Sequence, residues 1–336
     1  MKAVAYQQCH AISHKDALID IEMPEPVAKD RDIVVKIEAV SVNPVDTKIR
    51  RSVAPEQGQH KVLGWDAAGV VVGVGKQVSL FSVGDKVWYA GAIDRQGSNA
   101  EYHAVDERIV SKMPESLSFT EAAALPLTSI TAWEILFDRL RIGQNESATI
   151  LVIGAAGGVG SILIQLIKQL TQLTVVATAS RAETQQWVRS LGADHVINHH
   201  QPLSRELAAI DIEQVDYVVS LTNTDQHIDE INQLIKPQGK FAVIDDPGVL
   251  DVMPFKRKSV SIHWELMFTR SLFQTDDMIE QHYLLQKVAK LIDQGKIKTT
   301  LNQSFGAINA SNLMRAHQLI ESGQSKGKIV LTGFEN

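Results

Sequence analysis

Short apolar runs separated by turn residues fill the first third of the chain. The runs are rich in β-branched side chains, and dipeptides such as Asn43-Pro44 and Gly84-Asp85 lie between them. This pattern predicts an irregular, largely antiparallel β domain over residues 1 to about 124. The strands are expected at Ile33–Ile37, Ala67–Val74, Lys86–Tyr89 and Glu101–Val105.

From Thr149 onward, apolar strands alternate with helical patterns of about ten residues. This rhythm predicts a parallel, doubly wound sheet in an α/β domain. The expected strands are Thr149–Ile153, Thr174–Thr178, His195–Ile197, Val215–Val219, Lys240–Ile244 and Ser259–His263. The expected helices are Gly158–Leu170, Ala182–Leu191, Leu203–Ile210 and Asp225–Ile235.

The last part of the chain leaves this rhythm. Helical patterns at Asp276–Gln294 and Asn309–Ser322 precede an apolar strand at Lys328–Leu331. Because the strand–helix alternation occupies only the middle, the simplest architecture is a β-rich domain made from both chain ends with an inserted α/β domain. The predicted boundaries are 1–124, 125–261 and 262–336.

Composition excludes several classes of protein. The chain has 336 residues, 44% of them hydrophobic, and a net charge of −6, so neither a disordered chain nor a global field for nucleic acid or an anionic membrane is expected. Cys9 is the single cysteine, which excludes an internal disulfide and any site built from several thiolates. The sequence shows no export signal and no membrane-length apolar run, so a cytoplasmic protein is expected.

A glycine-rich turn follows the first strand of the α/β region and opens an apolar-periodic helix. In such a turn, backbone N–H groups approach a pyrophosphate at the positive end of the helix. The position between strand and helix makes a dinucleotide site the favoured interpretation over a loop that serves packing alone. The residues expected to bind the cofactor here are Gly154, Ala156, Gly157, Gly158, Val159 and Gly160.

The end of the next strand predicts which dinucleotide is bound. It carries Thr178, Ser180 and Arg181, and its first acid, Glu183, lies already inside the helix. A cation with hydroxyl groups suits the 2′-phosphate of NADP, whereas a carboxylate would suit the ribose of NAD. NADPH is therefore predicted, and the alternative is that Arg181 is a solvated residue at a helix start.

Beside the glycine turn, the chain contains four more motifs in order, from Asn43-Pro44-Val45-Asp46 through Gly64-Trp65-Asp66 and Gly84-Asp85 to Leu125-Pro126. Together they resemble the motifs of the medium-chain dehydrogenase/reductases. Within that superfamily they are most similar to the quinone oxidoreductases and the zinc-type alcohol dehydrogenase-like proteins. The resemblance covers nearly the whole chain and implies a GroES-like catalytic domain wrapped around a Rossmann domain, with the active site in the cleft between them. The motifs are Asn43–Arg50, Gly64–Val71, Val83–Val87, Ala122–Thr128 and the glycine turn.

The residues that would hold zinc in that family are absent. Asn43 stands where the first cysteine ligand is expected, Trp65 stands where a histidine is expected, and the third position is apolar. A carboxamide, an indole and an aliphatic side chain do not form a zinc site. With one thiol, the four-cysteine structural zinc site of the family is also excluded, so no metal is expected.

Four residues are the candidates for catalysis. Asn43 would hydrogen-bond the nicotinamide ribose or a substrate carbonyl, or else only form a turn. Asp46 would be either catalytic or a structural partner of a nearby cation. Lys48 would donate to an enolate oxygen or be solvated, and Trp65 would form the wall of a pocket for a planar acceptor.

The resemblance also implies further contacts. Thr128 and Lys328 would contact cofactor phosphates, and His199 would contact the adenine or else be a core or surface histidine. Phe268 and Arg270 would touch substrate. Leu221 follows the fourth parallel strand, at the edge where ligands bind in such sheets. Pairing of an edge strand near residues 259–263 would make a homodimer.

Three functions follow from these residues. The first is a zinc-independent, NADPH-dependent oxidoreductase that delivers hydride to a small-molecule substrate, a quinone or an α,β-unsaturated carbonyl. The second is a zinc-dependent alcohol dehydrogenase with atypical ligands. The third is a non-catalytic NADPH-binding protein.

Overall fold

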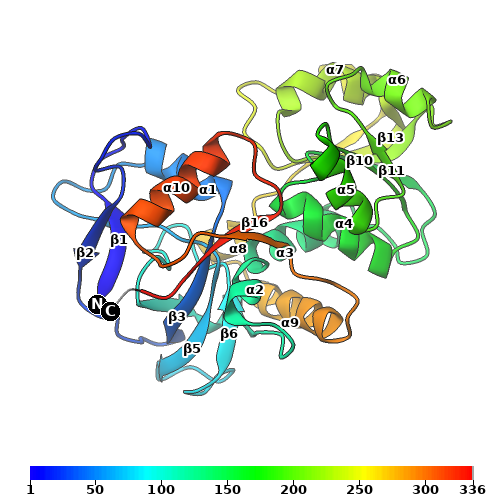
Figure 1. The fold of residues 1–336 in the computed structure, drawn as a ribbon. Helices are drawn as coiled ribbons and strands as arrows, with labels where there is room; N and C mark the ends of the chain where they lie inside the picture. Colours follow the sequence, from blue (N-terminus) through cyan, green and yellow to red (C-terminus); the bar gives the residue numbers. More distant parts are fainter. Residues whose placement is uncertain (335–336) are drawn as a thin grey trace. The chain divides into compact units, whose positions relative to one another are not determined.

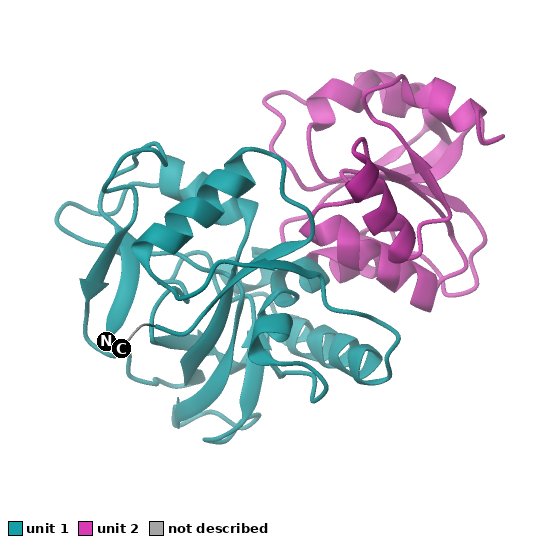
Figure 2. Ribbon diagram, in the orientation of Figure 1, with its two compact units in different colours: residues 1–130, 268–336 teal, residues 131–267 magenta. Residues whose placement is uncertain are grey.

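The computed structural model describes residues 1–334, which form two compact units. Unit 1 combines Met1–Ile130 with Phe268–Asn336, and unit 2 is Thr131–Met267 (Figure 2). The chain therefore crosses between the units twice, after residues 130 and 267. The sequence pattern predicts the domain boundaries after residues 124 and 261, six residues before each of these crossings.

Unit 1 is built around a seven-stranded sheet in which β15, β16, β3, β5, β6 and β8 lie in that order, with β7 also paired to β3. Figure 1 labels β3, β5, β6 and β16 of this sheet. The C-terminal strand β16 pairs antiparallel with β3, and Ile329 lies opposite Val42. Both ends of the chain thus contribute to one sheet. Its strands are β3 (Asp32–Val42), β5 (Ala67–Val74), β6 (Lys86–Tyr89), β7 (Tyr102–Asp106), β8 (Val110–Lys112), β15 (Leu301–Ser304) and β16 (Lys328–Thr332).

A smaller sheet and six helices complete unit 1. The small sheet has the order β2, β1, β4, from Ile19–Glu22, Lys2–Tyr6 and Lys61–Val62. Helix α3 begins in unit 1 and ends in unit 2, because the first crossing lies within it. The helices are α1 (Pro44–Ser52), α2 (Phe119–Ala123), α3 (Pro126–Trp133), α8 (Thr269–Leu272), α9 (Glu280–Asp293) and α10 (Ala310–Glu321).

Unit 2 is a six-stranded parallel sheet with the order β11, β10, β9, β12, β13, β14. This is the doubly wound order of a dinucleotide-binding fold. The predicted fold class is therefore confirmed. The strands are β9 (Thr149–Ile153), β10 (Thr174–Thr178), β11 (His195–Ile197), β12 (Val215–Ser220), β13 (Ile235–Val243) and β14 (Ser261–Trp264), and the helices are α4 (Gly158–Leu170), α5 (Ala182–Ser190), α6 (Leu203–Ala208) and α7 (Thr224–Leu234).

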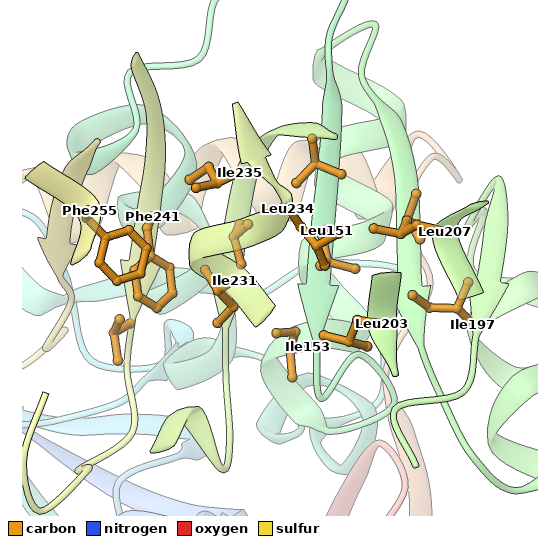
Figure 3. Close-up of a cluster of buried hydrophobic side chains, with 14 residues drawn as sticks. Leu151, Ile153, Ile197, Leu203, Leu207, Ile231, Leu234, Ile235, Phe241 and Phe255 are labelled. Carbon is orange, nitrogen blue, oxygen red and sulfur yellow. The ribbon is translucent and has the colours of Figure 1, made fainter. Parts of the chain in front are cut away.

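An apolar core packs between the sheet and its helices in unit 2 (Figure 3). Leu151 and Ile153 come from β9, Ile231 comes from α7, and Phe241 stacks with Phe255 at a ring-centroid distance of 5.7 Å. All of these side chains are at most 1% exposed. Their burial holds the carboxyl ends of the strands in place.

Two helices differ from the sequence prediction. The helix expected over Asp276–Gln294 begins only at Glu280, because Thr275 and Asp277 form a hydrogen-bonded turn before it. The second is a π-helix, η2 (Glu134–Arg139), which directly follows α3 and has i→i+5 hydrogen bonding that the sequence pattern does not indicate. Among residues 1–334, no helix has the length and apolar character needed to cross a bilayer.

Candidate functional site

The glycine-rich turn in unit 2 joins β9 to α4. Gly154 has a φ of +78°, in the left-handed region that glycine adopts without a steric penalty. A Cβ at this position would lie 2.8 Å from the Thr222 side chain. The Gly154 N–H donates to Thr178 Oγ1 over 3.0 Å, which fastens the turn to the end of β10. The turn is therefore held in one conformation.

Gly157 and Gly160 serve the same turn in different ways. A Cβ on Gly160 would lie 2.3 Å from the Ala155 carbonyl oxygen, so this glycine allows the helix to pack against the turn. A Cβ on Gly157 would meet only Gly154 O, at 3.5 Å. Gly157 is the N-cap of α4 without a side-chain cap hydrogen bond, so the first amides of the helix have no capping side chain. Ala156, Gly158 and Val159 are half-buried beside this helix start, which has the polarity that anions prefer.

The next strand end carries the residues predicted to distinguish NADP from NAD. Thr178 is buried and accepts the hydrogen bond from Gly154, whereas Ser180 is partly exposed. Arg181 is the N-cap of α5, and its side chain is 40% exposed. Its Nε lies 3.6 Å from Glu183 Oε1, and the Glu183 side chain is 62% exposed. An ion pair this exposed contributes little energy, so Arg181 can exchange it for a phosphate.

His199 and Leu221 lie beyond the carboxyl ends of β11 and β12. The Leu221 N–H donates to Ile153 O over 3.1 Å, which places it beside the glycine turn. His199 has ring contacts with His200 and His227, at centroid distances of 4.6 and 6.5 Å. Burial, and then the charges of these two histidines, lowers the pKa of His199. His199 is therefore favoured in its neutral form, which suits contact with an uncharged base.

In unit 1, a buried polar network forms where three strands of the sheet meet. Lys328 Nζ donates to Asp66 Oδ2 over 2.8 Å, to Asn43 Oδ1, and to Val42 O over 3.3 Å. Asn43 Nδ2 donates to Asp66 Oδ2 over 3.0 Å, and the Leu127 N–H donates to Asp66 Oδ1 over 2.8 Å. Lys328, Asn43 and Asp66 are at most 3% exposed. The three N–H bonds of Lys328 are directed at protein acceptors.

Asp46 lies next to this network, and its carboxylate accepts hydrogen bonds from two backbone N–H groups. Its Oδ2 accepts the N–H of Asn43 over 2.7 Å at the start of α1, and its Oδ1 accepts the N–H of Gly64 over 3.0 Å. Burial raises the pKa of Asp46 to about 7, against the opposing effect of these two hydrogen bonds and of Lys328. Asp46 thus joins the helix start to the loop that carries Trp65.

Trp65 and Phe268 pack edge to face at a centroid distance of 6.1 Å. Trp65 is fully buried, and its Nε1 donates to Ala92 O over 3.1 Å. Arg270 is also buried, and its guanidinium donates to Asp277 Oδ2 over 3.0 and 2.9 Å. Of the residues predicted near the substrate, Trp65 and Phe268 are therefore in contact with each other, whereas Arg270 is hydrogen-bonded to the Asp277 carboxylate.

The remaining predicted residues of unit 1 lie on helices. Lys48 is partly exposed on α1, and Thr128 is buried on α3, where its Oγ1 donates to Leu125 O over 3.1 Å. The sequence pattern gives Asp66, which follows Trp65 in the Gly64–Val71 motif, no role beyond the pocket wall expected of Trp65. The signal for its larger role was an acidic residue directly before the apolar strand Ala67–Val74, where an unpaired carboxylate would be costly to bury.

The donor set in this network does not fit zinc. The positions discussed above for zinc ligands carry Asn43 and the buried indole of Trp65, and the ammonium of Lys328 lies between Asn43 and Asp66. The ammonium of Lys328, held by oxygens of Asn43 and Asp66, would repel a zinc ion at the same place. Zinc also needs nitrogen, sulfur or carboxylate ligands that can turn toward the metal. Within residues 1–334, no three or more His, Cys, Asp and Glu side chains are arranged to hold a metal ion.

Removing the ammonium tests the network. Lys328→Met leaves the buried Asp66 carboxylate without its cation, so we expect a loss of about 3–5 kcal/mol in the free energy of unfolding, measured with urea. Adding Asp66→Asn should restore part of this loss. The exposed pair of Lys112 and Asp85, 2.9 Å apart, is the control, and Lys112→Met should cost less than about 1 kcal/mol. Equal losses in the two lysine variants would contradict the assignment.

The chain matches two domain families. Residues 29–115 match the "Alcohol dehydrogenase GroES-like domain", and residues 191–331 match the "Zinc-binding dehydrogenase" family. A zinc-type alcohol dehydrogenase-like protein of Staphylococcus aureus is 41% identical over 98% of this chain and 99% of its own. A 2-methylene-furan-3-one reductase of Solanum lycopersicum is 31% identical over 98% of this chain and 79% of its own.

A solved structure agrees over the full length. The crystal structure of a Rhizobium etli protein, assigned by its name to the zinc-dependent alcohol dehydrogenases, is 54% identical and has a TM-score of 0.96. The similarity covers 100% of this chain and 99% of that one. Together with the two-domain architecture, these similarities show that the chain belongs to the medium-chain dehydrogenase/reductase superfamily and is an oxidoreductase.

Proposed function

We propose that the protein is a zinc-independent, NADPH-dependent reductase of quinones or α,β-unsaturated carbonyl compounds. The observation that carries this proposal is the network of Asn43, Asp66 and Lys328, whose ammonium group would oppose a Lewis acid at the same position. Oxidation of an alcohol by this family's zinc chemistry needs such a position. Reduction of an acceptor that is already electron-poor does not.

The glycine turn supports the cofactor half of the proposal. The open backbone at Gly157 and the first amides of α4 would bind the pyrophosphate, and Arg181 with Ser180 would bind the 2′-phosphate. Leu221 and His199 lie at the same edge of the sheet and would contact the rest of the nucleotide. When bound, the nicotinamide supplies the hydride.

The unit 1 residues would position the acceptor. Trp65 and Phe268 form a buried aromatic pair that would support the wall of a site for a planar molecule from behind. The Solanum lycopersicum relative acts, by its name, on a 2-methylene-furan-3-one, which conjugates a C=C bond with a carbonyl group. We assign Lys48, partly exposed on α1, as the candidate that donates a proton to the enolate oxygen.

The experiment that tests the function is NADPH and NADH oxidation with matched quinones, enones and aldehydes, alongside the metal content of the purified protein. We expect turnover of quinones or enones with NADPH, little alcohol oxidation with NADP, and less than stoichiometric zinc. Hydride transfer to an activated acceptor needs no metal, which is the physical reason for this outcome.

Two other results would support the competing functions. About one bound zinc per chain, together with alcohol oxidation that a chelator abolishes, would establish the alcohol dehydrogenase with atypical ligands. NADPH binding without turnover of any class of acceptor would establish the non-catalytic NADPH-binding protein.

Arg181→Ala tests the choice of cofactor. Loss of charge-assisted hydrogen bonds to a 2′-phosphate should raise the Kd for NADPH about 10- to 100-fold and that for NADH less than about threefold. Fluorescence titration measures both constants. Arg189→Ala, an exposed arginine on the same helix, should change neither. An equal change for both cofactors in Arg181→Ala would refute the phosphate assignment.

We also propose a homodimer formed through β14. This strand is the edge of the parallel sheet, and Trp264 and Leu266 beside it are 53% and 50% exposed. A second copy would pair with the edge and cover both side chains. Sedimentation equilibrium should give a dimer for the wild type and mostly monomer for Trp264→Asp. A wild-type monomer at tens of micromolar would exclude this interface.

A further inference from the structure

A pair of buried glutamates lies at the two points where the chain enters and leaves unit 2. Glu134 is three residues after the start of the unit at Thr131, and Glu265 is two residues before its end at Met267. They are 1% and 4% exposed. The functional assignments above use neither residue, and two buried carboxyl groups need a physical explanation.

Arg139 connects the two glutamates. Its Nε lies 2.7 Å from Glu265 Oε2, and its Nη2 lies 3.9 Å from Glu134 Oε2. Glu134 and Arg139 are the first and last residues of the π-helix η2. In an α-helix, two residues five positions apart are rotated around the helix axis by a full turn plus about 140°, so their side chains point in different directions. In a turn with i→i+5 hydrogen bonding the extra rotation is smaller, and the two side chains lie closer to the same side of the helix. The π-helix therefore allows one segment to supply both the acid and its counter-ion.

The backbone fixes Glu265 on the other side. It directly follows β14, and its N–H donates to Val243 O of β13 over 3.0 Å. Neither carboxyl oxygen of Glu265 has a well-aligned hydrogen-bond donor among the described residues, in spite of the short ion pair with Arg139. The neighbouring group is the Glu134 carboxyl. A proton held between the carboxyl groups would satisfy an oxygen of each.

The charges balance with one such proton. Two carboxylates and one guanidinium would leave a net charge of −1 on these three groups, whereas one carboxyl, one carboxylate and one guanidinium leave none. The Arg139 side chain is 31% exposed, but both carboxyl groups are buried, and two neighbouring buried carboxyl groups do not both ionise readily. Burial, and then the charge of Glu134, raises the pKa of Glu265 to about 9, against the opposing effect of Arg139.

The other charged groups nearby come from neighbouring strands and from the end of η2. His263 of β14 lies near Lys240, Arg139 and Arg141, and burial followed by the charges of these cations lowers its pKa, which favours its neutral form. Lys240 of β13 donates to the Leu140 carbonyl. These groups do not supply the missing proton.

We propose that Glu134 and Glu265 share one proton, with Arg139 as counter-ion, and that this acid pair fastens the entry segment of unit 2 to its exit segment. The pair is a positioning device for the two segments through which the chain joins the nucleotide-binding fold to unit 1. It responds to alkaline pH, since loss of the shared proton leaves an unpaired buried charge.

The test is the pH dependence of stability in the full-length protein, from pH 5 to 10. Glu265 has a higher pKa in the folded state than in the unfolded state, so its contribution is largest at acid pH and is lost as pH rises toward about 9. The urea midpoint of the wild type should therefore fall relative to that of Glu265→Gln across this range. Glu213→Gln, an exposed acid of the same unit, should follow the wild type.

Glu134→Gln provides an independent variant. Removing this neighbouring charge lowers the pKa of Glu265, so the fall in stability should end at lower pH than in the wild type. In the unmodified protein at pH 8, the infrared spectrum should contain a protonated-carboxyl band that Glu265→Gln or Glu134→Gln reduces. A constant difference between wild type and Glu265→Gln from pH 5 to 10, without that band, would show an ordinary Arg139 ion pair and overturn the proposal.

Discussion

The ion pair between Lys328 and Asp66 is the interaction on which unit 1 depends. Lys328 begins β16, Asn43 follows β3 and Asp66 precedes β5, and these three strands are neighbours in the sheet. The Lys328 ammonium and the Asp66 carboxylate therefore meet where the C-terminal strand β16 joins the strands from the first part of the chain. Because an unpaired buried charge is costly, a slip of β16 along β3 would be opposed by the loss of this pair as well as by the loss of apolar contacts.

The same network decides which chemistry the site supports. Asn43 is held from both ends of its amide, by Lys328 and by Asp66, and Asp46 is held by two backbone N–H groups. A cation of the protein itself, Lys328, thus balances the Asp66 carboxylate next to Asn43. In the proposed reductase the cofactor would supply the reactivity, and the residues of the chain would place the reactants and exclude water.

Local patterns were enough to predict much of the fold. Strand–helix alternation identified the parallel sheet, since its hydrophobic periods are properties of short segments. The glycine turn was recognisable because Gly154 and Gly160 are constrained by backbone conformation and close packing, which leave few other choices of residue. The π-helix at Glu134–Arg139 was not predicted, because its apolar pattern there differs little from that of an α-helix.

The sequence by itself determined the fold class, the glycine turn and the residue types at the positions of the family's zinc ligands. Only the tertiary structure decided what those residues contact. Lys328, for which a phosphate contact is predicted, contacts Asn43 and Asp66 in the structure, more than 260 positions away in the chain. Arg270 was expected to touch substrate, and it contacts Asp277. Such pairings depend on burial and on distances between remote segments, and a linear pattern contains neither.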